Sequence, residues 1–74
     1  MKEKEKLIKA LKEIFDELGT WISIDDLFLM VNNEYKFTNG VSKTKITSAL
    51  SKNAECLKIS KNHETFYFVK RWYT

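Results

Sequence analysis

The spacing of the apolar residues changes once along this sequence, close to residue 54, and the change restricts the folds that the chain can adopt. Before this point the apolar residues recur three and four positions apart, which is the spacing of one helix face. After it, Leu57 and Ile59 alternate with polar residues on one face of a strand, and the segment 65–72 is rich in aromatic and β-branched residues. Helices followed by a β-hairpin predict an α+β fold.

Two helices are expected in the first part of the chain. The first covers residues 2–18, and its apolar face ends next to Gly19, which suits a left-handed C-cap. Residues 20–23 form a short extended stretch of β-branched and aromatic residues. The second helix covers 24–32, with Ser23 as its N-cap.

A third helix and a hairpin complete the predicted order of elements. Residues 32–42 connect the second helix to the third, which covers 43–53. The strands 56–60 and 65–72 are separated by the polar turn 61–64, and together they predict a β-hairpin.

Size and composition limit the classes of function. With 74 residues we expect a single domain over residues 1–74, which buries only about 60% of its unfolded surface and has little room for a catalytic cleft. The one cysteine, Cys56, cannot form an internal disulfide, which favours an intracellular, reducing compartment. No stretch has the apolar length of a signal peptide or a membrane span, so we expect a cytoplasmic, nucleoid-associated protein with no membrane partner.

The charges are divided unevenly along the chain. Residues 1–34 carry a balance of −3, residues 35–74 carry a balance of +6, and the whole chain carries +3. This asymmetry indicates a basic binding half on an acidic scaffold, and polyanions are the partners that such a half attracts. The alternative is that ordinary surface lysines are spread unevenly.

The third predicted helix has an unusual polar side. Ile46, Ala49 and Leu50 share one side of it, and no acidic residue occurs between residues 41 and 54. The opposite side carries short hydroxyls flanked by lysines: Thr44, Lys45, Thr47, Ser48, Ser51 and Lys52. Short hydroxyls allow close approach to a DNA groove and lysines neutralise phosphates. The alternative is that these hydroxyls only cover a solvent-exposed face.

The predicted order of helix, short strand, helix, helix and hairpin resembles the winged helix, a member of the helix-turn-helix class, from Leu7 to Tyr73. This resemblance implies a duplex-DNA-binding protein whose third helix enters the major groove while the hairpin, or wing, contacts the DNA backbone. The expected DNA-binding residues are Lys43, Thr44, Lys45, Thr47, Ser48, Ser51 and Lys52 in the helix, and Lys61, Asn62, His63 and Arg71 in the hairpin, with Lys58 and Lys70 as further candidates.

A second, weaker resemblance covers the last half of the chain. Ser42-Lys43, Leu50 and Phe66-Tyr67 are similar to the pattern of the C-terminal winged-helix domain of phage and mobile-element primase–helicases. The two resemblances imply a role in transcription regulation or in DNA replication. The chain would act alone, as a homodimer, or as a module of a larger protein.

Other functions are compatible with parts of the sequence. The sequence lacks a phosphate-binding loop and metal-ligand spacing, so we expect no enzyme activity, no small-molecule substrate and no cofactor. One alternative is a protein-interaction module that uses the first helix with Trp72 and Tyr73, unless these aromatics instead seal the hairpin against that helix. Another is single-stranded nucleic-acid binding through Phe66, Tyr67 and Phe68, which we expect to be mostly buried, as we do Trp21.

Overall fold

The computed structural model describes residues 3–73, which form a small compact α+β domain. Three helices and a three-stranded antiparallel sheet follow in the order α1 (Glu3–Leu18), β1 (Ile22–Ser23), α2 (Ile24–Glu34), α3 (Lys43–Asn53), β2 (Ala54–Lys61) and β3 (Glu64–Trp72). This confirms the expected α+β class and the expected order of elements. Residue 2, the expected start of the first helix, lies outside the described residues.

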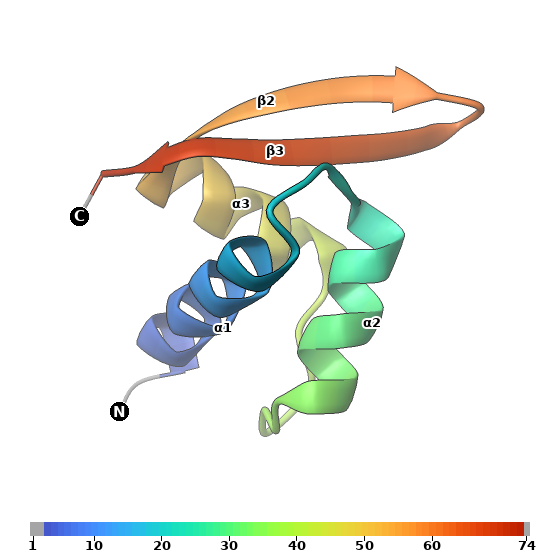
Figure 1. Cartoon of the computed structure of the whole chain (residues 1–74). Helices are drawn as coiled ribbons and strands as arrows, with labels where there is room; N and C mark the ends of the chain where they lie inside the picture. Colours follow the sequence, from blue (N-terminus) through green and yellow to red (C-terminus); the bar gives the residue numbers. More distant parts are fainter. Residues whose placement is uncertain (1–2, 74) are drawn as a thin grey trace.

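The three helices lie on one side of the hairpin formed by β2 and β3, and the turn of the hairpin extends past them (Figure 1). The sheet order is β1-β3-β2, so β2 forms an edge of the sheet. The side chains of Leu11, Leu27, Val31, Ile46 and Leu50 are fully buried where the helices meet. Each helix therefore contributes its apolar stripe to one shared core.

The connection before α3 is held in place by one amide. Asn32 donates from its side chain to the carbonyl oxygens of Phe28 and Val41, both at 2.9 Å, and accepts from the backbone N–H of Val41 at 2.8 Å. Gly40 adopts a φ of +70° in this connection, a conformation that favours glycine. The second helix continues to Glu34, two residues beyond the expected end, because its last residues are polar and give no periodic signal.

The hairpin turn consists of Asn62 and His63, which both have positive φ values of 53° and 66°. Two such residues form a type I′ turn, whose twist matches that of the flanking strands. Further along, Glu55 pairs with Arg71 and Cys56 pairs with Val69, so Lys70 is an extra residue in β3. This bulge shifts the alternation of β3, and Trp72 returns to the side of the sheet that faces the helices.

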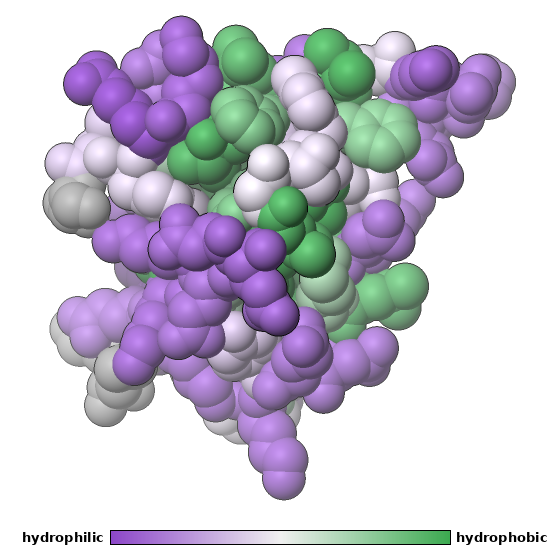
Figure 2. Space-filling view, viewed as in Figure 1, coloured by the Kyte–Doolittle hydropathy of each residue, from purple (hydrophilic) through white to green (hydrophobic). Residues whose placement is uncertain are grey.

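The two faces of the hairpin differ in what covers them. Cys56, Tyr67 and Val69 contact the core, and with Lys58 they belong to what we call the inner face. The outer face comprises Leu57, Ile59, Phe66 and Phe68, with Trp21 from the segment before β1 lying against Phe68 at a ring-centroid distance of 5.6 Å. In Figure 2 green apolar surface lies over the hairpin between purple surfaces at its two ends.

Candidate nucleic-acid interface

Helix α3 is fixed by apolar anchors on one side and open to solvent on the other. Ser42 caps its N-terminus by accepting from the N–H of Lys45 at 3.2 Å, and Ile46 and Leu50 are buried beneath it. The opposite side of α3 is exposed at Lys43, Thr44, Lys45, Ser48, Ser51 and Lys52. The helix therefore has the orientation that its sequence pattern indicates.

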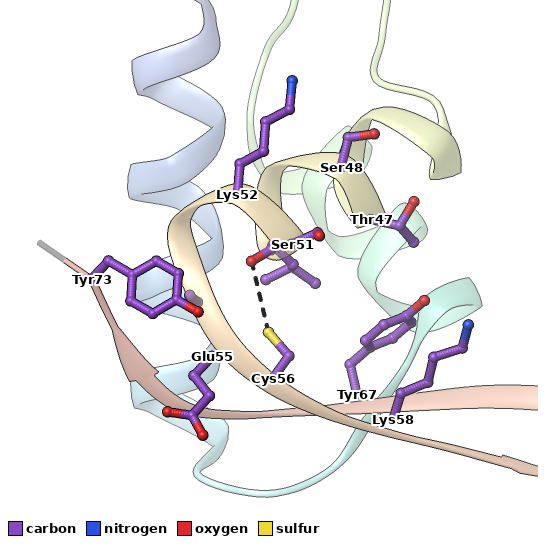
Figure 3. Close-up of a pocket in the computed structure, with 11 residues that line it drawn as sticks. Thr47, Ser48, Ser51, Lys52, Glu55, Cys56, Lys58, Tyr67 and Tyr73 are labelled. Atoms are coloured by element: carbon purple, nitrogen blue, oxygen red, sulfur yellow. Dashed lines mark hydrogen bonds between the residues drawn. The ribbon is translucent and has the colours of Figure 1, made fainter.

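A groove of about 640 Å³ lies between α3 and the inner face of the hairpin. Its lining includes Thr47, Ser51 and Lys52 from α3 and Cys56, Lys58 and Tyr67 from the hairpin. Figure 3 shows Cys56, Lys58 and Tyr67 pointing toward α3 and Glu55 pointing the other way. We name this the α3–hairpin groove. It brings lysines and hydroxyls of two elements onto one concave surface.

One hydroxyl of α3 already has a partner. Thr47 is half-buried and donates from Oγ1 to the carbonyl oxygen of Thr44 at 3.0 Å. Such a bond to the preceding turn satisfies the hydroxyl within the helix. Ser48 and Ser51 are exposed, so they are better placed than Thr47 to donate to a ligand.

Two carboxylates, one at each end of α3, are matched by cations. Glu55 accepts from Arg71 Nε at 3.0 Å and lies 3.6 Å from Lys70 Nζ. Lys43 pairs with Asp25 and lies over the ring of Phe28. These pairs neutralise the carboxylates but also occupy Arg71 and Lys43, which were both expected to contact DNA. The register places Arg71 on the outer face, opposite Glu55.

The hairpin tip is exposed at Lys61, Asn62 and His63, as the turn prediction requires. These residues are not among those that line the groove, whereas Lys58 and Tyr67 are. The sequence suggested Tyr67 only as a partner of Phe66 and Phe68 in single-strand binding, and did not predict its place in a groove with α3. The sequence does contain a signal, because Tyr67 lies between Phe66 and Phe68 and its side chain must be on the other face of the strand. This alternation does not indicate which face the helices cover.

Two expectations about the large aromatics were tested by the structure. The expected burial of Trp21 is wrong: its side chain is 36% exposed and lies on Phe68 of the outer face, which none of the described helices covers. Trp72 is half-buried, and its ring meets Phe15 of α1 edge-on at 6.5 Å. Trp72 therefore seals the hairpin against α1, while Tyr73 stays 56% exposed.

Three groups have shifted pKa values, and each shift has a local cause. Burial raises the pKa of the Cys56 thiol, whose Sγ lies 3.9 Å from the carbonyl oxygen of Leu50 at the groove floor. Hydrogen bonds with Thr38 lower the pKa of Glu3 and hold the connection onto α1. The hydrogen bond that Tyr35 donates to Glu13 raises the pKa of Tyr35 to about 12.

The described residues 3–73 contain no group of three or more His, Cys, Asp or Glu side chains able to hold a metal ion. Within the same range, no helix has the length and apolar character needed to cross a membrane. Comparison of the chain with protein-family models, with curated proteins and with solved structures found no match.

Proposed function

We propose that this protein is a winged-helix domain that binds duplex DNA, with α3 in the major groove and the hairpin as the wing beside it. The observation that carries the proposal is the α3–hairpin groove. Its exposed cations, Lys52 and Lys58, come from the helix and from the strand. Among the described residues that line it, the one carboxylate is Glu55, which is paired with Lys70 and Arg71. A concave surface of this charge suits the phosphate backbone.

The residues divide into two roles. Lys45, Lys52 and Lys58 neutralise phosphates, because they are exposed around α3 and the groove. Ser48 and Ser51 donate to phosphates or base edges from the exposed side of α3. Arg and Gln, which make many of the specific base contacts, are missing from α3, so a single copy discriminates weakly among sequences. Transcription regulation and DNA replication both use domains of this kind.

Salt dependence of duplex binding tests the proposal. If four to six lysines meet phosphates, the slope of log K against log salt is about −4 to −5. Fluorescence anisotropy with a labelled duplex measures this slope. A flat salt dependence overturns the proposal.

Charge reversal locates the interface. Lys45→Glu and Lys52→Glu should each weaken duplex binding by roughly tenfold without unfolding the domain, because each removes a phosphate contact. Lys9→Glu is the matched control, since Lys9 is exposed on α1 and carries the same change in charge. Equal losses for all three variants would mean that binding follows net charge and not α3.

The competing assignment to protein binding through the C-terminal aromatics has weaker support. Trp72 is engaged with Phe15 and with Lys12, whose Nζ lies 5.7 Å from its ring centroid, so it serves the fold. Tyr73 remains exposed, but one aromatic ring is a small interface.

A further inference from the structure

The free edge of β2 carries a pattern that is complementary to itself. Within residues 3–73, the sheet order β1-β3-β2 leaves one side of this eight-residue strand without a strand neighbour. Along its outer face, β2 presents Glu55, Leu57, Ile59 and Lys61, which is the order acid, apolar, apolar, base. Reversing the strand gives base, apolar, apolar, acid. A second copy in antiparallel orientation therefore places base against acid and apolar against apolar side chains at these four positions.

Exposure of the apolar side chains rises toward this edge. Phe66 and Phe68 lie on the central strand β3 and are half-buried. Leu57 and Ile59 lie on β2 and are 42% and 47% exposed. The side chains of an edge strand have a neighbouring strand on one side only, so a second β2 would give each of them a new apolar neighbour.

The backbone of β2 is also suited to such pairing. In a hairpin with a two-residue turn, the residues that flank the turn, here Lys61 and Glu64, form a hydrogen-bonded pair. Hydrogen-bonding then alternates along the strand, so Cys56, Lys58 and Ser60 direct their N–H and C=O groups to the free edge. These groups can bond to the same three residues of another copy.

We propose that this protein forms a two-fold dimer by antiparallel pairing of β2 with β2 of a second copy, centred on Lys58. In this register Leu57 faces Ile59 of the other copy, Glu55 faces its Lys61, and Cys56 faces its Ser60. The two three-stranded sheets become one sheet of six strands. Registers centred on Leu57 or Ile59 keep the hydrogen bonds but lose the match of acid with base.

The dimer would also affect DNA binding. This one consequence rests on the proposed function, whereas the dimer itself does not. An axis perpendicular to the sheet keeps both copies of α3 on the same side, which is the arrangement needed to read two half-sites. The two Lys58 side chains then face each other on the inner face. Their repulsion weakens the free dimer, and a DNA phosphate between them would relieve it, so DNA and dimerisation would favour each other.

Complementary charge variants test the register without DNA. Glu55→Lys places lysine against Lys61 of the second copy, and Lys61→Glu places glutamate against its Glu55, so each variant alone should dimerise roughly tenfold more weakly than wild type. Mixed together, the two variants restore both opposite-charge pairs, and a heterodimer of wild-type strength should form. Sedimentation equilibrium at chain concentrations up to about 1 mM measures all three samples. A monomeric wild type, or a mixture no tighter than its parents, overturns the proposal.

Cross-linking tests the centre of the pairing independently. In a Cys56→Ser background, Lys58→Cys should give a disulfide-linked dimer on mild oxidation, because opposed residues of a hydrogen-bonded pair have Cα atoms about 5.5 Å apart. Ser60→Cys in the same background is the matched control: it lies on the same edge, but its partner in this register is the serine at position 56. Equal cross-linking of both variants would contradict pairing centred on Lys58. Neither assay contains DNA, so a negative result in either one overturns the dimer without bearing on the proposed DNA binding.

Discussion

The inner and outer faces of the hairpin come from the same two strands but have opposite characters. Near α3, the inner face contacts the core through Cys56 and Val69, whereas toward the turn it presents Lys58. The outer face is apolar at Leu57 and Ile59 although solvent reaches both. A strand that covers a core normally turns its apolar residues inward. Toward the turn this hairpin does the reverse, which is what the proposed DNA ligand on the inner face and the proposed second copy along β2 would require.

The largest expected effect is on stability, and it comes from truncating a leucine in the core, with a leucine on the outer face as its control. Leu50→Ala removes a side chain that is 1% exposed in the core, and we expect a loss of about 2–5 kcal/mol in the free energy of unfolding. That is comparable to the whole stability of a domain of this size, roughly 3–5 kcal/mol. Leu57→Ala makes the same chemical change on the outer face and should cost less than about 1 kcal/mol.

Urea unfolding followed by circular dichroism measures both variants at a low chain concentration. Wild type provides the reference, and the slope of the transition should stay unchanged if the fold is the same. Equal losses for Leu50→Ala and Leu57→Ala would show that the outer face is covered, and the contrast between the two faces would be wrong.

The order of elements could be predicted because each helix and strand carries its own periodic signal. The three helices and the hairpin follow from apolar spacing, and the capping role of Ser42 follows from its place before α3. The face of a strand that is covered could not be predicted in the same way. Alternation of Leu57 and Ile59 with polar residues identifies a strand, but the pattern is equally compatible with either face being buried.

The ion pairs could also not be predicted from the sequence. Asp25 lies 18 positions before Lys43, so their contact depends on how α2 and α3 are arranged in space. Glu55 lies 16 positions before Arg71, and their contact depends on the register of β2 with β3, which the bulge at Lys70 shifts. The exposed side of α3 could be predicted because buried anchors at helical spacing determine the opposite side. The α3–hairpin groove required the tertiary structure, since its lining comes from two elements of different periodicity.

Removing one cation from each face should have an intermediate effect, which is measured on the salt dependence of DNA binding. Lys58→Gln on the inner face should make the slope of log K against log salt less steep by about 0.9, because one phosphate contact is lost. Arg71→Gln on the outer face should change the slope less, since Arg71 is engaged with Glu55 and lies on the face opposite the proposed DNA-binding side. Anisotropy titrations at several salt concentrations measure both slopes. A larger change for Arg71→Gln would assign DNA binding to the outer face.

The smallest expected effect is a difference in alkylation rate between a thiol at the floor of the groove and a thiol on the outer face. Burial raises the pKa of Cys56, so less of it is thiolate at pH 8 and its alkylation by iodoacetamide should be slow. Ile59→Cys in a Cys56→Ser background places the same thiol on the exposed outer face, where it should react faster and with a pH midpoint below that of Cys56. In concentrated urea the two proteins should react alike, since the difference belongs to the folded state. Equal rates in the folded proteins would mean that Cys56 is open to solvent, in which case α3 does not close the floor of the groove and the inner face loses its separate character.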